Sequence, residues 1–381
     1  MATNNNPLLN CPPLRFPEFS DPWKKTTLGE VAEFIQYRGK SNTLYLSVES
    51  FLPNFQGIAD LQNDTQSSGI GFEPDDVLMS NIRPYLRKVW YANRSGTCSP
   101  DVLVFRSKSV ILPKFLYSII ANQSFVSYIM QGAKGVKMPR GDKQQMLLYS
   151  FSLPHFSEQG KIAKFLSLID ERIETQRQTI EERKKQKKAL LHQIFSQSLR
   201  FPNFSAPWQQ TTLGEVCTIK TGKLDANAMV EDGSYPFFTC AKQTYQTDTY
   251  SFSGEAILIA GNGEVGLTKY YNGKFNAYQR TYVLQSLSSD VILLFIKNHI
   301  DYTLPKRIIS FLNGSAMPYI TLSTLSDMPI CLPSLEEQRK IAKLLAIFDE
   351  RIEAEEALLK CYESQKRYLL RQMFCLSKSS Y

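Results

Sequence analysis

Two stretches of this 381-residue chain interleave cationic, aromatic and amide side chains. Duplex DNA requires this combination, because Lys and Arg neutralise phosphates while Arg, Asn and Gln can pair with base edges. For any single residue, a solvated strand face with ordinary charges is an equally good interpretation, but the clusters favour DNA. The predicted DNA-binding residues are Asn81, Arg83, Tyr85, Arg87, Lys88, Lys134, Lys137 and Arg140 in the first stretch, and Asn262, Lys269, Tyr270, Lys274, Arg280, Asn313 and Ser315 in the second.

Catalytic and metal-binding signatures are missing from the sequence. Gly39-Lys40-Ser41 lacks the earlier glycine of a phosphate-binding loop, because Phe34 stands at that position. The segment 261–266 spells G-x-G-x-x-G, but we expect a turn rather than a helix after it, which argues against a dinucleotide site. The seven cysteines are scattered and never form C-x-x-C. We therefore predict no catalytic residue, no metal ligand and no cofactor held by this chain.

Composition and charge bound the class of protein. A chain of 43.5 kDa with 43% hydrophobic residues is expected to form more than one globule. Its formal net charge of +8 favours a polyanionic partner. The first residues show no basic segment followed by an apolar one, and no run of 18 apolar residues occurs. We expect a protein without membrane spans, in a reducing cytoplasm.

The chain is a tandem duplication. The block at 15–31, with Trp23 and Thr-Thr-Leu-Gly-Glu-Val, returns at 200–216, and the block at 153–174 returns at 332–353. Between these blocks lie two dissimilar stretches of similar layout, about 32–134 and 217–313, each closing with Gly-x-x-Met-Pro. Strand-like and short helical patterns broken by Gly, Asn and Pro predict an α+β fold for each stretch.

The repeated carboxy-terminal block predicts two long helices, at about 158–198 and 336–376, each with an apolar stripe near heptad spacing. We expect the stripes to bury each other in an antiparallel intramolecular pair, with the globules at opposite ends and the chain ends close together. The alternative is that each stripe packs on its own globule. Ser334 with Glu337 predicts a capping box, and Ser157 is the expected cap of the first helix.

These doubled blocks, in this order around two unlike segments, resemble the specificity subunit of Type I restriction–modification systems. The resemblance covers nearly the whole chain and implies two target recognition globules of α/β type, joined by a long antiparallel helix pair in a pseudo-twofold duplicated chain. The boundaries are residues 1–153 for an amino-terminal arm and first target recognition domain, 154–199 for a central helix, 200–331 for the second target recognition domain and 332–381 for a carboxy-terminal helix.

The resemblance also implies the partners and the activity. Each target recognition domain would read one half of a split site in double-stranded DNA, while the helices set the spacer and dock two methyltransferase subunits. Motor-nuclease (restriction) subunits would join them, so S-adenosylmethionine, ATP and Mg would be bound by partners in a bacterial or archaeal cytoplasm. We further expect the exposed helix surfaces and the Glu-Gln blocks to contact partner protein. A coiled-coil adaptor without DNA reading remains the alternative, as does a fused enzyme, which would need motifs that the sequence lacks.

Overall fold

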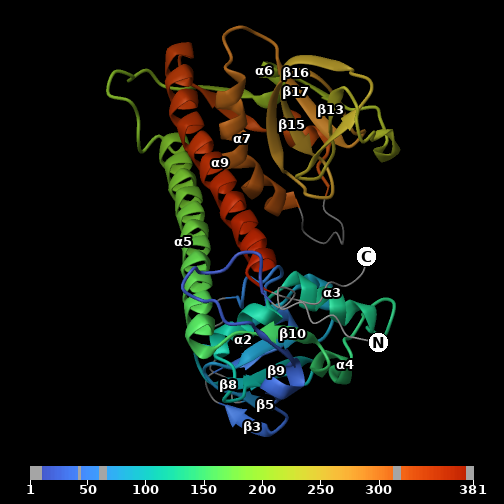
Figure 1. The fold of residues 1–381 in the computed structure, drawn as a ribbon. Coiled ribbons are helices and arrows are strands. Elements are labelled where there is room, and N and C mark those ends of the chain that lie inside the picture. Colours follow the sequence, from blue (N-terminus) through green and yellow to red (C-terminus); the bar gives the residue numbers. More distant parts are fainter. Residues whose placement is uncertain (1–10, 42–43, 60–66, 312–318, 375–381) are drawn as a thin grey trace. The chain divides into compact units, whose positions relative to one another are not determined.

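The computed structural model describes residues 11–41, 44–59, 67–311 and 319–374, and the chain divides into two units (Figure 1). Unit 1 comprises Met1–Gln176 and Leu358–Tyr381, whereas unit 2 comprises Arg177–Ala357. Each unit therefore holds one globule and a part of each long helix. Within the described part of the chain, no helix is long and apolar enough to span a bilayer.

Unit 1 contains two four-stranded sheets, ordered β2-β9-β6-β7 and β3-β5-β8-β4, and a separate β1-β10 pair. Its strands are β1 Lys24–Thr27, β2 Ala32–Phe34, β3 Arg38–Ser41, β4 Tyr45–Leu46, β5 Ser67–Phe72, β6 Val77–Ser80, β7 Val89–Tyr91, β8 Gly96–Cys98, β9 Val102–Ser107 and β10 Ser150–Leu153. Its helices are α1 Leu28–Val31, η2 Val48–Ser50, η3 Pro84–Leu86, α2 Pro113–Ile120, α3 Gln123–Gln131, α4 Lys143–Leu147 and the first part of α5 Phe156–Phe195.

The central strands of unit 1 are buried on both faces. Val77 and Met79 of β6 belong to a core shared with α2, α3 and the long helices, whereas Leu78 between them belongs to a second core under β4, β5 and β8. Successive side chains of a strand point to opposite faces, so a continuous apolar run is what such a strand requires. The strand expected from the apolar run at 77–79 is confirmed as β6.

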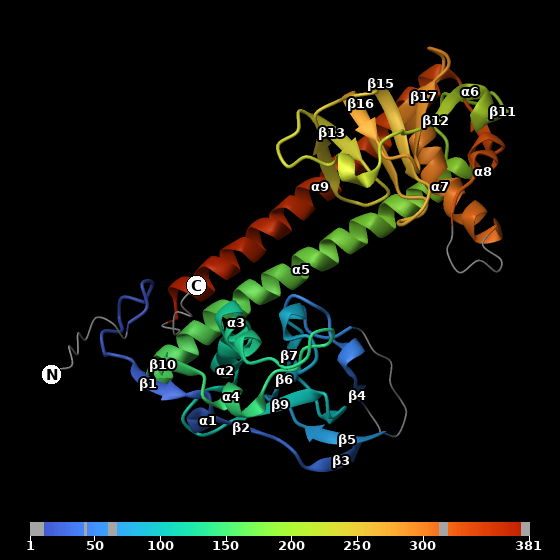
Figure 2. The same ribbon diagram turned by 90° about the vertical axis from the view of Figure 1, so that its right-hand side faces the viewer.

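Unit 2 has one six-stranded sheet, ordered β12-β17-β15-β16-β13-β14, and a β11-β18 pair that matches β1-β10 (Figure 2). Helix α7 contacts β15 and β16. The strands are β11 Gln209–Thr212, β12 Cys217–Thr221, β13 Tyr235–Phe238, β14 Thr244–Thr247, β15 Phe252–Ala260, β16 Thr268–Ala277, β17 Thr281–Ser286 and β18 Pro329–Leu332. The helices are α6 Leu213–Val216, η4 Ala226–Ala228, α7 Leu293–Phe311, α8 Leu322–Ser326 and most of α9 Leu335–Gln372.

The repeated Thr-Thr-Leu-Gly-Glu-Val block forms the same capped turn in both units. The Glu30 carboxylate accepts the backbone N–H of Thr27 at 2.8 Å, and Glu215 accepts that of Thr212 at 2.9 Å. A Cβ on the glycine of this turn would stand 3.2 Å from a side-chain carbon of the short helix opposite, Leu147 in unit 1 and Ser326 in unit 2. The glycine lets α1 pack closely on α4 in unit 1 and lets α6 pack equally closely on α8 in unit 2.

The Glu-Gln pair at the start of each long helix is buried inside its unit. Glu158 accepts two hydrogen bonds from the Arg15 guanidinium, at 2.7 and 2.8 Å, and Glu337 accepts two from Arg200, at 3.0 and 2.8 Å. The glutamines act alike: Gln159 accepts the backbone N–H of Leu112 at 2.8 Å, as Gln338 accepts that of Ile292 at 3.0 Å. Our expectation that the Glu-Gln blocks contact partner protein is therefore wrong, because these side chains are already used within the chain.

Both expected helix caps also need correction. Helix α5 begins one residue before Ser157, so His155 takes the cap position, and its Nδ1 lies 3.5 Å from the Ser157 backbone nitrogen that donates to it. At α9, the Ser334 hydroxyl accepts the Glu337 N–H at 3.3 Å, which is half of a capping box. The Glu337 carboxylate binds Arg200 instead of closing the box.

Helices α5 and α9 pair antiparallel, as contacts inside each unit show. In unit 1, Asp170 of α5 binds Lys366 of α9, and in unit 2 the duplicated residues exchange roles, with Lys187 2.5 Å from Asp349. Ile162 and Leu166 also share one core with Leu369 and Met373 of α9 and with the globule. The expected antiparallel pair is therefore confirmed, and the alternative is true in part, because the same stripes pack on their globules.

The first described residues lie beside the end of α9. The backbone N–H of Leu14 donates to the carbonyl oxygen of Gln372 at 2.9 Å, so the expected proximity is confirmed for the described residues nearest the two ends. The amino-terminal frame block thus contacts the start of α5 and the end of α9. The placement of the two globules at opposite ends of the helix pair stays a prediction.

We expect Glu158→Ala to lower the free energy of unfolding by about 3 kcal/mol. The substitution leaves two groups without their carboxylate partner, the half-buried guanidinium of Arg15 and the indole N–H of Trp23, which lies 3.1 Å from the carboxylate. Chemical denaturation of the full chain measures the change. The matched control is Glu18→Ala, which removes only an exposed pair with Lys161 and should cost below about 1 kcal/mol. Equal losses for the two variants would contradict the role of the buried pair.

His299 of α7 gives unit 2 a pH-dependent stability. Burial among aromatic rings, including Phe195 with ring centroids 4.9 Å apart, lowers the pKa of His299 to about 4. The unfolded chain takes up this proton near pH 6.5, so the stabilisation is complete above that pH and is lost as the pH falls toward 4.

Between pH 6.5 and 5 we expect the full chain to lose about 2 kcal/mol of stability through His299 alone. Denaturation at a series of pH values measures this slope, and carboxyl groups titrate chiefly below this range. His299→Gln cannot take up a proton, so the variant should show a flatter profile. A variant profile parallel to that of the natural chain would contradict the assignment.

Candidate nucleic-acid interface

The first cluster of predicted residues lies on a turn between β6 and β7, which pair antiparallel. Arg83 and Arg87 flank the single turn η3, with positive φ values of 51° and 58°. The Nε atoms of both guanidiniums are buried without a hydrogen-bond partner in the described structure, and Tyr85 between them is exposed. The expected hairpin is confirmed, and its tight turn fixes the two arginines on either side of an exposed aromatic ring.

Other members of this cluster stabilise the globule. Lys88 donates to the carbonyl oxygen of Val48 at 2.8 Å and so ties β7 to η2. Trp90 packs edge-on against Phe72, and the Tyr91 hydroxyl donates to Asp75. These contacts account for Lys88 within the fold, so its place on a DNA-binding surface stays a prediction.

Residues 134–140 form a short antiparallel hairpin that we call the finger. Lys134 and Arg140 exchange two backbone hydrogen bonds of 2.9 Å, and the finger is held to the β6–β7 turn because the N–H of Arg83 donates to the carbonyl oxygen of Pro139 at 2.8 Å. Gly135 has a φ of 97°, a left-handed conformation that favours glycine. The repeated Gly-x-x-Met-Pro motif thus marks the bend of a hairpin in unit 1.

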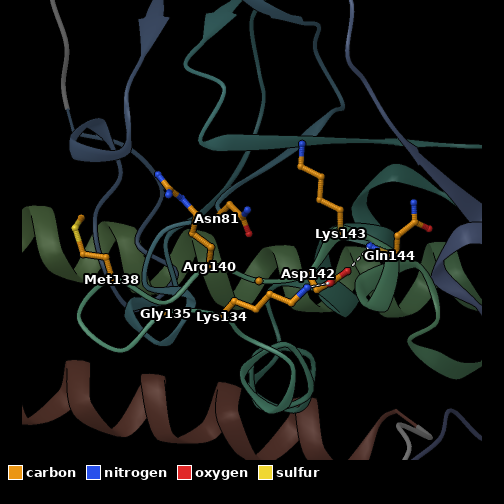
Figure 3. A pocket seen from close by; sticks show the side chains of 9 residues that line it. Asn81, Lys134, Gly135, Met138, Arg140, Asp142, Lys143 and Gln144 are labelled. Atoms are coloured by element: carbon orange, nitrogen blue, oxygen red, sulfur yellow. Dashed lines mark hydrogen bonds and ion pairs between the residues drawn. The ribbon is translucent and has the colours of Figure 1, made fainter.

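A hollow of about 550 Å³ lies beside the finger and brings three predicted residues together, Asn81, Lys134 and Arg140 (Figure 3). Arg140 pairs with Asp101 at 3.2 Å, and Lys134 pairs with Asp142 at 3.2 Å. Asp142 also accepts the backbone N–H groups of Gln145 and Gln144 as the cap of α4, and these amides with Lys134 lower the pKa of Asp142. Exposed cations are thus presented from a rigid, internally hydrogen-bonded support.

In unit 2, the predicted residues of β16 divide between the two faces of the sheet. Tyr270 and Lys274 lie on the exposed face, whereas Lys269 points to the other face. There Lys269 donates to the carbonyl oxygens of Ala241 at 2.9 Å and Gln243 at 3.3 Å, and its desolvation lowers the pKa of this ammonium. Lys269 therefore holds the loop after β13, while Lys274 lies 4.7 Å from the ring of Tyr250.

The glycine-rich segment at 261–266 connects two antiparallel strands. Gly263 and Gly266 have positive φ values, and the segment that follows is β16 rather than the turn we expected. It is not the start of a helix either, so no helix amino terminus is present there to bind a pyrophosphate. Asn262 lies in this connection, half-buried.

The two units place opposite charges at the same corner of the fold. The backbone N–H of Asn81, just after β6, donates to the carbonyl oxygen of Asp101 at 2.8 Å, just before β9. In unit 2 the corresponding pair is Gly261, just after β15, and Arg280, just before β17. The backbone N–H of Gly261 donates to the carbonyl oxygen of Arg280 at 2.9 Å. Arg280 therefore stands, exposed, where unit 1 has an aspartate.

The predicted sites are only partly assembled by the structure. Lys137 is exposed on the finger, while Asn313 and Ser315 lie outside the described residues. Sequence reasoning missed Asp101 and Asp142, which orient two of the cations. Asp142 could have been found as a helix cap before 143–147, whereas the pairing of Asp101 with a distant arginine has no local signal. Among the described residues, no group of His, Cys, Asp and Glu could hold a metal ion.

The family model for the Type I restriction modification DNA specificity domain matches the chain twice, at residues 20–183 and 206–361. The chain is 40% identical over 154 residues to the EcoDI specificity subunit of Escherichia coli, a match covering 40% of this chain and 33% of that relative. It is 24% identical to the MjaVIII specificity subunit of Methanocaldococcus jannaschii, over 94% of this chain and 92% of that one. The EcoDI match thus spans about a third of that relative's length.

Two solved structures share the fold. The crystal structure of a type I restriction–modification S subunit from M. genitalium aligns with a TM-score of 0.62 at 19% identity, covering 96% of this chain and 99% of that one. A structure from work on complex assembly and conformational transition of the type I restriction–modification system aligns with a TM-score of 0.54 at 19% identity, covering 95% of this chain and 98% of that one. Because the family model matches each globule together with its long helix, the chain belongs to this family as a specificity subunit of a type I restriction–modification system.

Proposed function

We propose that each unit reads one half of an asymmetric, bipartite site in double-stranded DNA. The observation that carries this proposal is that one frame supports two unlike surfaces. The capped turn, the buried Glu-Gln pair and the strand pair beside the long helix occur in both units. The sheets differ, being two of four strands in unit 1 and one of six strands in unit 2.

The exposed groups in the two units suit different base sequences. Unit 1 presents the exposed Tyr85 and the cations of the finger beside the half-buried Arg83, whereas unit 2 presents Tyr270, Lys274 and Arg280. Arg reads guanine through two acceptors, and Lys contacts phosphates as a point charge. A different set of donors in each unit supports a site whose two halves differ.

In this proposal the helix pair sets the unread spacer between the half-sites. Helix α5 has 40 residues and α9 has 38, so each is about 60 Å long. At 3.4 Å per base pair this length corresponds to at most about 18 base pairs, from which the footprints of the reading surfaces must be subtracted. An ion pair between the two helices in each unit supports this role.

Catalysis is proposed to belong to partner subunits. Two methyltransferase subunits would dock on the exposed helix surfaces and bind S-adenosylmethionine, and motor-nuclease subunits would bind ATP and Mg. The complex would act in the cytoplasm, on the DNA of the cell. Sequence-selective retention on DNA by the chain with its methyltransferase subunits separates this proposal from a coiled-coil adaptor, which would retain partners but no DNA sequence.

Inserting four helix-forming residues after Gln176 in α5 and four after Glu355 in α9 lengthens both helices by about 6 Å. We expect the methylated site to keep its two half-sites and to gain one or two base pairs of spacer. Methylome sequencing of cells that carry the variant and its methyltransferase subunits measures both features.

The matched control inserts the same four residues after Asp232, in an exposed loop of unit 2, and should leave the spacer unchanged. Altered half-sites with the original spacer in the helix variant would overturn the spacer role of the helices.

We expect Arg280→Ala to weaken binding by about 1–3 kcal/mol at one half-site and to relax base preference there, because its exposed guanidinium can pair with a base. Arg83→Ala should have the same effect on the other half-site. Competition binding with duplexes altered in one half-site measures both. A loss that is equal for every sequence would assign the arginine to phosphate, and unchanged affinity would remove it from the interface.

A further inference from the structure

The finger presents apolar side chains to solvent in the middle of a cationic surface. Val136 is fully exposed (103%) and Met138 is half exposed (50%). Apolar groups at the tip of a rigid hairpin are not needed for the core of unit 1, which is complete beneath them. Both side chains are therefore available for a contact with another molecule.

The charges around the tip select the class of that molecule. Lys137 lies on the finger, Lys134 and Arg140 form its base and Lys143 follows it at the start of α4, while the carboxylates Asp101 and Asp142 are already paired with two of these cations. The excess positive charge complements a polyanion rather than an apolar protein surface. Three of these cations, Lys134, Arg140 and Lys143, also line the hollow beside the finger.

The shape of the finger selects the groove. One bridge pair, Lys134 with Arg140, closes the finger, whose two arms lie side by side, and the wide major groove of B-DNA admits a two-armed element of this kind. In the major groove the apolar feature of a base edge is the C5 methyl group of thymine. Apolar side chains that insert between base steps do so from the minor groove, so a contact with this methyl group is the apolar contact that the finger can make in the major groove.

We propose that the finger reads thymine in the half-site of unit 1 through apolar contact of Val136 and Met138 with its C5 methyl group. This proposal rests on the proposed function and deepens it by naming the chemical group that is read. The cations of the finger hold the flanking phosphates, and the two hydrogen bonds at its base keep the tip from folding away. The second copy of the motif carries Ser315 where unit 1 has Val136, and it keeps a methionine, Met317, where unit 1 has Met138.

The test compares thymine with uracil, which lacks only the methyl group. Duplexes carrying the target sequence have each thymine replaced singly by uracil, and the full chain with its methyltransferase subunits is titrated with each duplex. We expect the natural chain to lose about fourfold in affinity at one thymine of the half-site read by unit 1, which corresponds to one methyl group removed from an apolar contact.

Val136→Ser and Met138→Ser supply the other half of a double-mutant cycle. At the thymine concerned, we expect at least one of them to bind thymine and uracil duplexes equally while discriminating normally elsewhere. The matched control is Leu148→Ser, which removes an exposed apolar side chain (67%) of unit 1 outside the finger and should keep the fourfold preference. Because Val136 is fully exposed, its substitution leaves the fold intact, and circular dichroism checks this.

Two results would overturn the inference. One is that no thymine shows a uracil effect that depends on residue 136 or 138, and the other is that both substitutions lower affinity equally for all duplexes. In either case the natural chain still binds its target, so the proposed function survives. Failure of the natural complex to prefer any sequence would instead overturn the proposed function.

Discussion

The fold depends on a buried carboxylate at the first turn of each long helix. Glu158 and Glu337 are almost fully removed from water, and such a charge is tolerated only when it is paired and hydrogen-bonded. Arg15 and Arg200 supply the pairs, and each guanidinium also donates to a backbone carbonyl of its own frame block. The requirement for a partner therefore fixes where each frame block meets its helix, and the strand pair beside it follows.

The duplication lets the two long helices stabilise each other by exchanging equivalent residues. An aspartate of α5 binds a lysine of α9, and the matching lysine of α5 binds the matching aspartate of α9. Each helix also packs into the core of the globule beside it, so the pairing of the helices does not depend on these ion pairs alone.

Constant supports and variable surfaces lie in different parts of each unit. The frame blocks and helix starts use buried ion pairs and capped turns, so substitutions there act on stability. Most of the exposed groups stand on turns and connections between strands, such as the finger and the corner before β9 or β17, and Tyr270 and Lys274 lie on the exposed face of β16. A loop on a rigid scaffold can change its side chains at little cost to the core. This separation suits a protein whose two globules recognise different sequences on one architecture.

The sequence by itself determined the duplication, the two long helices, the central strands and the absence of recognisable catalytic motifs. These features are periodic or repeated along the chain, so they can be read from spacing alone. The tertiary structure decided what individual polar residues do. Lys88 and Lys269, predicted from the sequence to contact DNA, also bind backbone carbonyls within the fold, and the Glu-Gln pair, expected to contact partner protein, is buried. Such roles depend on which groups, tens of residues apart in the sequence, come within hydrogen-bond distance of one another. That distance cannot be predicted from the local sequence.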